Sequence, residues 1–286
     1  MNDRTDRDRV ARRSRVLDCR GRALALGEKT QIMGILNVTP DSFSDGGRYA
    51  DVEAAVEHAK AMVAAGADLI DIGGESTRPG AEPVSEEEEL RRVIPVIEAL
   101  REAVSVPLSI DTFKPGTARR ALAAGAHLLN DIWGCRRHPE MADLAAEYGC
   151  PIILMHNRTE PEYGDFLADV LADLSESVRI AKKAGVREEQ IILDPGIGFA
   201  KSQEQNLQLI GSLDRLAELG YPVLLATSRK RVIRNVLNLP AEDVVEGTVA
   251  TTVLGIAQGC DLVRVHEIKE NARAALMADA IVRRRA

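Results

Sequence analysis

The residues Gln31-Ile-Met-Gly-Ile-Leu-Asn37 form an apolar run of strand length that ends in a polar side chain. Seven more short apolar runs follow along the chain, and they end at Asp71, Asp111, Asn130, His156, Asp194, Ser228 and Arg264. Strands that are apolar on both faces are typical of parallel sheets covered by helices, and barrels of this kind build their active sites at the C-terminal ends of the strands. The sequence therefore predicts a (β/α)8 TIM barrel with a site at that rim.

The segments between these runs have the apolar periodicity of helices. The expected helices span residues 51–65, 85–103, 114–124, 139–148, 165–184, 202–219, a region within 228–258, and 266–283. Ser85 and Glu88 have the spacing of a capping box at the start of the second helix. Before the first strand, residues 16–28 alternate apolar and polar around two glycines, which predicts a small hairpin that caps the bottom of the barrel.

Composition limits the class of protein. The chain has 286 residues, of which 45% are hydrophobic, and we expect one barrel domain over residues 16–286 after a disordered charged tail at 1–15. A net charge of -7 argues against non-specific binding to nucleic acid, and no run approaches the ~20 apolar residues of a membrane span. The four cysteines have no zinc-ligand or C-x-x-C spacing, and no signal peptide is evident, so a reduced cytoplasmic setting is expected.

Two long loops follow the first two strands, over residues 38–49 and 73–84. They are rich in small donors and include Thr77 and Arg78, so they could close over a phosphate, although flexible surface loops are the alternative. Asn37 offers an oxygen to a hard cation such as Mg2+, which needs only one or two protein ligands when phosphate oxygens complete its shell. A structural Asn turn is the competing interpretation of Asn37.

Asp111, Asn130 and Asp194 end three different strands and should point into the mouth of the barrel. Buried carboxylates are costly unless they are paired, and the amidine-like edge of a pterin ring would pair with them. Each residue alone could be structural, but three converging by accident is a weaker explanation. The segments Ser228-Arg-Lys-Arg231 and Arg264-Val-His266 add a positive cluster suited to phosphate, where the alternative is a solvated surface.

Several segments resemble those of the dihydropteroate synthase family. The most specific are Gly34-Ile-Leu-Asn-Val-Thr-Pro-Asp-Ser-Phe-Ser-Asp-Gly-Gly47 and Asp71-Ile-Gly-Gly-Glu-Ser-Thr-Arg-Pro-Gly80. Asp194-Pro-Gly-Ile-Gly-Phe199, Ser228-Arg-Lys230 and Arg264-Val-His266 follow in the order typical of the family, and the likeness runs from about residue 31 to the end. It implies condensation of (7,8-dihydropterin-6-yl)methyl diphosphate with 4-aminobenzoate, which releases diphosphate and 7,8-dihydropteroate.

The resemblance also implies roles for single residues. Four of them would hold the pterin: Asp111, Asn130, Asp194 and Lys230. Four would contact the diphosphate: Thr77, Arg78, Arg264 and His266. Asn37 would bind Mg2+ as the only expected cofactor, and the catalytic residues would be Asp111, Lys230 and Arg264. The resemblance further implies a cytoplasmic homodimer that is a target of sulfonamides. Its partners would be small-molecule substrates, with no nucleic acid and no membrane.

Four positions depart from the family pattern. Arg231 stands where Ser is frequent, Arg234 and Ala200 stand where Gly is common, and His266 is followed by Glu267 rather than Asp. Two other functions stay open at this point, a corrinoid-linked methyltransferase domain on a similar pterin-binding barrel and a non-catalytic paralogue that binds pterin. The first would not be expected to carry the whole first loop with Ser228-Arg-Lys230, and the intact Asn37, Arg78 and Lys230 argue against the second.

Overall fold

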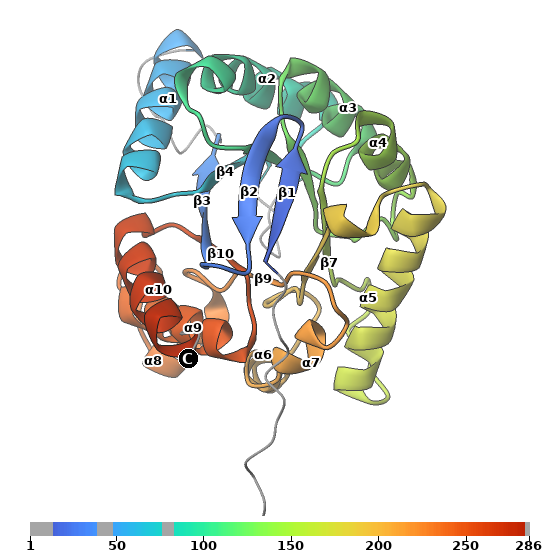
Figure 1. Cartoon of the computed structure of the whole chain (residues 1–286), viewed down its shortest axis with the longest axis vertical. Helices are drawn as coiled ribbons and strands as arrows, with labels where there is room; N and C mark the ends of the chain where they lie inside the picture. The colour runs from blue at the N-terminus through green and yellow to red at the C-terminus, as the bar shows by residue number, and fades with distance from the viewer. Residues whose placement is uncertain (1–13, 39–47, 76–82, 284–286) are drawn as a thin grey trace, which may run out of the picture.

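Eight parallel strands form the centre of the computed structural model, which describes residues 14–38, 48–75 and 83–283 (Figure 1). The strands are β3 (Gln31–Asn37), β4 (Leu69–Gly73), β5 (Leu108–Asp111), β6 (Leu128–Asp131), β7 (Ile152–Met155), β8 (Ile191–Asp194), β9 (Leu224–Leu225) and β10 (Leu262–Val265). Their order in the sheet is β8-β7-β6-β5-β4-β3-β10-β9. A parallel bridge between Leu193 and Val223 joins the two edges, so the sheet closes and the predicted barrel is confirmed.

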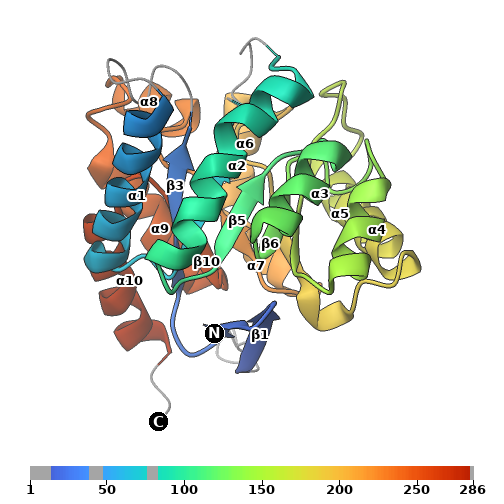
Figure 2. The same ribbon diagram turned by 90° about the horizontal axis from the view of Figure 1, so that it is seen from above.

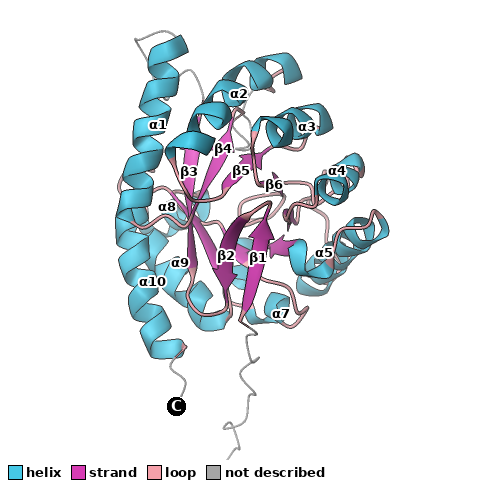
Figure 3. Cartoon of the chain, turned by 45° about the horizontal axis from the view of Figure 1, so that its top comes forward, coloured by secondary structure: helices cyan, strands magenta, loops and turns pink. Residues whose placement is uncertain are grey.

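Helices surround the strands on the outside of the barrel (Figure 3). They are α1 (Arg48–Ala65), α2 (Glu86–Ala103), α3 (Pro115–Ala124), α4 (Glu140–Tyr148), α5 (Phe166–Lys183), α6 (Gln203–Ile210), α7 (Asp214–Ala217), α8 (Arg231–Leu237), α9 (Val245–Gln258) and α10 (Ile268–Val282), with a 3-10 turn at Glu188–Gln190. None of the helices within the described ranges is long and apolar enough to cross a membrane.

Side-chain caps fix where several helices begin. The Ser85 hydroxyl accepts the Glu88 amide at 3.2 Å at the start of α2. The Glu88 carboxylate binds Arg91 and Arg92 instead of the Ser85 amide, so the predicted capping box is half formed. A complete capping box joins Ser202 and Gln205 at the start of α6.

The helix expected over residues 202–219 is interrupted, because a side chain from α9 occupies the break between α6 and α7. Gln258 donates from Nε2 to the Ile210 carbonyl at 2.7 Å and accepts the Leu213 amide at 3.0 Å. These bonds satisfy the backbone groups that a continuous helix would have paired. The region 228–258 likewise forms two helices, with Asn238 in the left-handed conformation that ends α8.

A two-stranded hairpin closes the bottom of the barrel, as predicted. Its strands are β1 (Arg15–Cys19) and β2 (Arg22–Leu26). Four apolar side chains of the hairpin pack in one cluster with inward-pointing residues of the barrel strands. The hairpin residues are Leu17, Cys19, Leu24 and Leu26, and the strand residues are Met33, Leu69, Leu128, Ile153, Ile192, Leu224 and Leu262. In Figure 2 the hairpin lies below the barrel, at the end from which β3 and β5 run upward.

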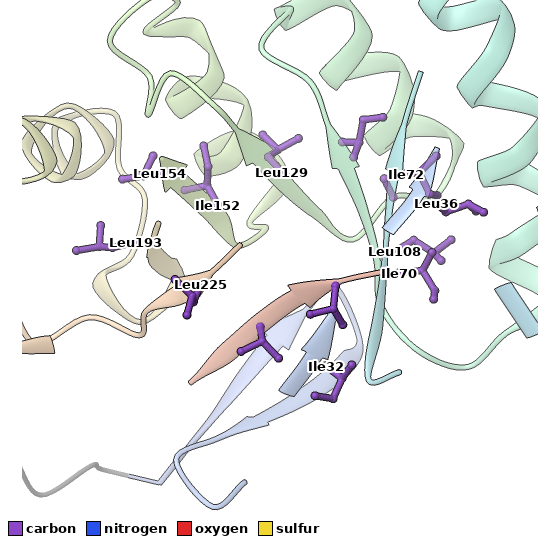
Figure 4. Close-up of a cluster of buried hydrophobic side chains, with 14 of the residues drawn as sticks. Ile32, Leu36, Ile70, Ile72, Leu108, Leu129, Ile152, Leu154, Leu193 and Leu225 are labelled. Atoms are coloured by element: carbon purple, nitrogen blue, oxygen red, sulfur yellow. The ribbon is translucent and has the colours of Figure 1, made fainter. Parts of the chain in front are cut away.

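Outward-facing strand residues form a second cluster with the helices. Ile32, Ile70 and Leu129 belong to it (Figure 4), and it also contains Val93 from α2 and Leu122 from α3. Alternation along each strand therefore separates a helix-facing core from the lumen. All four cysteines are buried, and burial raises the pKa of the Cys19 and Cys150 thiols to about 12.

Candidate active site

A cavity of about 790 Å³ opens at the C-terminal ends of the strands. Every described residue to which the sequence assigned a role lines it: Asn37, Asp111, Asn130, Asp194, Lys230, Arg264 and His266. Thr77 and Arg78 lie outside the described residues. Residues that are far apart in sequence meet here because parallel strands bring their C-terminal ends to one face.

Arg264 joins two carboxylates across the lumen. Its Nε donates to Asp71 Oδ2 at 2.6 Å, and its Nη2 donates to Asp111 Oδ2 at 2.8 Å. Asn130 donates from Nδ2 to the same Asp71 oxygen at 3.0 Å. Asp71 was noted in the sequence as a strand end without a role in the site. The structure shows that it holds Arg264 and Asn130 in place.

Buried polar atoms near the ends of β4 and β5 are left without hydrogen-bond partners. Within the described part of the chain, three buried side-chain atoms have no hydrogen-bond partner: Asp71 Oδ1, Asp111 Oδ1 and Ser109 Oγ. Burial raises the pKa of Asp111 to about 7, against the opposing effect of Arg264 and with a further increase from Asp71. Buried oxygens left in this state favour a ligand that brings N–H donors.

Asp194 lies at the end of β8 and faces the same cavity. Its Oδ1 accepts the Gly196 amide at 2.7 Å, and burial raises its pKa despite the nearby charge of Lys230. Gly196 has φ 69°, and a Cβ there would come within 1.9 Å of the His156 carbonyl oxygen. Only glycine can therefore form the turn that points its amide at Asp194.

Lys230 occupies the N-cap position of α8 without a side-chain capping bond, and its side chain reaches back to the loop after β8. Its Nζ donates to the Ile197 carbonyl at 2.7 Å and lies 5.0 Å from the centre of the Phe199 ring. Burial lowers its pKa to about 8, while the charge of Asp194 acts in the opposite direction. The charges of Lys230 and Asp194 therefore act on one another within the same cavity.

Four neighbouring residues link the loops after β9 and β10. The Ser228 hydroxyl lies 2.9 Å from His266 Nδ1, and it also accepts the His266 amide at 3.2 Å. Arg229 donates from Nε to Glu267 at 2.5 Å. Glu267, one of the four positions that depart from the family pattern, therefore forms an ion pair that ties the two loops together.

A buried lysine that the sequence did not single out supports the loop after β8. Lys201 Nζ contacts His156 Nδ1 at 2.8 Å and donates to the carbonyls of Gly196 at 2.9 Å and Phe199 at 3.0 Å. Burial lowers its pKa to about 7. The sequence signal that could have identified Lys201 is its position after a glycine-containing segment at the end of a strand. Ala200, beside it, has φ 46°, a left-handed conformation that glycine adopts without strain, so the glycine expected here from the family resemblance would fit the same backbone.

Asn37 lies at the end of β3 and is half-buried. Its Oδ1 is 3.8 Å from the position that a Cβ on Gly73 would occupy, on the side where the Asp111 side chain also approaches. Among the residues that the structure describes, no group of three or more His, Cys, Asp or Glu side chains could hold a metal ion. A hard cation here would therefore rest on one amide oxygen and on ligands from outside the protein.

The chain belongs to the family of pterin binding enzymes, whose model matches residues 33–266. The dihydropteroate synthase of Clostridium beijerinckii is 58% identical over 260 residues, which are 91% of this chain and 97% of the relative. A Clostridium difficile dihydropteroate synthase solved with pteroic acid has a TM-score of 0.89 at 50% identity and covers 91% of this chain and 99% of its own. The Xanthomonas albilineans dihydropteroate synthase with 4-aminobenzoic acid has a TM-score of 0.90 at 47% identity, covering 94% and 98%.

Within that family the chain groups with the dihydropteroate synthases, which are transferases of folate biosynthesis. The resemblance inferred from the sequence is thereby confirmed. The match spans almost the whole length of these relatives, so neither a methyltransferase domain nor a non-catalytic paralogue is needed to explain the chain.

Proposed function

We propose that the cavity at the C-terminal rim performs dihydropteroate synthesis with its pterin substrate held between Asp111, Asn130 and Asp194. The observation that carries this assignment is the buried Oδ1 of Asp111, a residue that lines the cavity, which has no donor among the described residues. The amino and ring N–H groups of a pterin supply such donors, and Lys230 offers a donor to an acceptor atom of the ring. Pteroic acid and 4-aminobenzoic acid, the ligands of the two solved relatives, support this occupant.

The reaction then requires charge to be stabilised in two places. The 4-aminobenzoate nitrogen forms a bond to the methylene carbon, the bond from that carbon to the diphosphate oxygen breaks, and one proton leaves the nitrogen. The carboxylates of Asp111 and Asp194 stabilise the positive charge that develops on the pterin methylene. An aromatic amine is a neutral nucleophile, so no strong general base is required.

The leaving diphosphate would meet the positive groups of the site. Arg264 uses two of its N–H groups on Asp71 and Asp111 and has others to offer, and His266 lines the cavity beside Ser228. Thr77 and Arg78 stay predictions, as both fall in the segment left out of the description. Arg231 and Arg234 are exposed at the rim of the same cavity and add positive charge at the side where an aminobenzoate carboxylate would enter.

Asn37 fits the Mg2+ that the reaction is expected to use. Its side chain lines the cavity, and its Oδ1 lies on the side of Gly73 that the Asp111 side chain also approaches. Mg2+ supplies charge neutralisation for the diphosphate oxygens when it is bound. Among the described residues, Asn37 would contribute an oxygen ligand to the cation.

We also propose that the enzyme is a cytoplasmic homodimer. Eight of the ten exposed large apolar side chains in the described residues lie on α8 to α10 or in the turn after α8: Val236, Leu237, Leu239, Val253, Leu254, Leu276, Met277 and Ile281. These helices lie side by side on one flank of the barrel (Figure 1). A patch of this kind favours association with a second copy. Four buried thiols are consistent with a reducing compartment.

A coupled assay tests the proposed activity directly. Purified protein is supplied with dihydropterin diphosphate, 4-aminobenzoate and Mg2+, and diphosphate release is followed with each component omitted in turn. We expect release only when both substrates are present. Release without 4-aminobenzoate, or methyl transfer to another acceptor, would contradict the proposal.

A further inference from the structure

A second cavity, of about 300 Å³, lies at the opposite end of the barrel from the catalytic one. Six residues line it: Arg20, Arg22, Arg101, Glu102, Gly125 and His127. They come from the turn of the hairpin, the C-terminal end of α2 and the segment that enters β6. Three guanidinium groups therefore converge on one hollow, and the cavity contains one carboxylate, Glu102.

Backbone carbonyls hold these guanidinium groups in place. Arg20 Nη1 donates to the carbonyls of Leu122 and Ala126, and Arg22 donates to those of Val106 and Arg101. All four carbonyls belong to the C-terminal ends of α2 and α3 or to the residues that follow them, so the arginines serve as helix caps. The bonds also fix the directions of the remaining N–H groups before any ligand arrives.

Arg101 completes the wall. Its Nη1 donates to the Ala124 carbonyl at 3.3 Å and its Nε to Glu102 at 3.0 Å, which leaves Nη2 without a partner in the described part of the chain. A Cβ on Gly125 would come within 2.7 Å of Arg101 Cδ, so glycine at this position makes room for the arginine stem. Glu102 is thus already paired, and the cavity keeps an excess of positive charge.

His127 supplies a neutral donor at the bottom of the same cavity. Its Nδ1 accepts the Leu108 amide at 3.1 Å, so the proton of the neutral ring must lie on Nε2. Burial, together with the charges of Arg22 and Arg20, lowers the pKa of His127 to about 4. The ring therefore stays neutral at physiological pH while its N–H remains available.

We propose that this cavity is a binding site for a small oxyanion of the phosphate type. Three fixed cations and a neutral N–H donor around one hollow match the charge and the acceptor oxygens of a phosphate. Helix capping alone accounts for the bonds to carbonyls, but it does not account for three guanidinium groups and an imidazole N–H facing the same space. The site is separate from the catalytic cavity and independent of the proposed reaction.

Histidine ring NMR of the whole protein tests this without any substitution. The chain has five histidines, so their ring signals can be resolved and assigned. Inorganic phosphate is titrated at pH 7.5 with chloride replaced to keep the ionic strength constant. We expect a saturable shift of the His127 signals at this pH, and a rise in the pKa of His127 when a pH titration is repeated with phosphate, because an anion beside the ring favours its protonated form. His266 reports binding in the catalytic cavity separately.

Two variants and a second ligand sharpen the test. Arg101→Gln keeps most of the stem and removes one charged donor, and we expect phosphate to bind about tenfold more weakly, which is the loss of one charge-assisted hydrogen bond. Arg179→Gln, an exposed arginine on α5, is the matched control and should bind as the parent does. The titration is repeated with AMP. If AMP binds more tightly than inorganic phosphate, the site favours a phosphomonoester, and the reverse order indicates a site for free phosphate. A His127 shift that never saturates, or equal affinities in parent and Arg101→Gln, would overturn the proposal.

Discussion

Arg264 and Asp71 form an ion pair through the lumen, with Nε and Oδ2 2.6 Å apart, although they belong to β10 and β4 with β3 between them. The same guanidinium binds Asp111, whose pKa is raised mainly by burial and further by the charge of Asp71. Asp71 therefore influences the ionisation of Asp111, the carboxylate proposed to bind the pterin, although no hydrogen bond joins the two side chains.

The pH dependence of kcat/KM should follow from this arrangement. Asp111, with a pKa of about 7, is ionised above that pH, and Lys230, with a pKa of about 8, is protonated below that pH. Activity that needs both forms rises through about 7 and falls above about 8. Asp71→Asn removes a charge that raises the pKa of Asp111, so the acid limb should move to lower pH while the alkaline limb stays. An unmoved acid limb in this variant would disprove the coupling.

Asp194→Ala should abolish detectable binding of a pterin analogue. The variant removes the charged partner of the ring's amino edge, a loss of roughly 2–5 kcal/mol for a buried charged hydrogen bond. Calorimetry measures the affinity, and Asp143→Ala, which changes an exposed carboxylate on α4, serves as the control. If a folded Asp194→Ala protein binds the analogue as tightly as the parent, the proposed position of the pterin is wrong.

Asn37→Ala should separate binding of the pterin from binding of the diphosphate. Pterin-analogue affinity should be nearly unchanged, while the gain in affinity for the diphosphate substrate on adding Mg2+ should shrink, because the cation loses an oxygen ligand. Titrations with and without Mg2+ measure both quantities. Equal losses in the two conditions would identify Asn37 as a turn residue instead.

Leu276→Glu should convert the dimer to a monomer. Leu276 is 64% exposed on α10, and a carboxylate there would be buried without a partner in the association proposed above. Sedimentation measures the mass, and Val16→Glu, at an equally exposed position on the hairpin, is the control that should leave it unchanged. A parent protein that sediments as a monomer would remove the basis for the dimer.

The sequence was sufficient to predict the barrel and the residues at the strand ends, because apolar runs and their polar ends are local patterns. It could not predict the contacts between those residues, which depend on closure of the barrel. Asp71 meets Arg264 across 193 positions of sequence, and Glu267 gains its role through Arg229 and Ser228 of the preceding loop. The break between α6 and α7 was missed for the same reason, since it depends on Gln258 of another helix.

Burial of every cysteine has a practical consequence for following this enzyme at work. A thiol reacts as its thiolate, and the raised pKa values of Cys19, Cys135 and Cys150 leave these thiols protonated near neutral pH. A cysteine introduced at an exposed position would therefore be labelled selectively in the native protein. Asn235 is such a position, on the rim of the catalytic cavity, and a fluorophore attached to Asn235→Cys would report the arrival and departure of each substrate in real time.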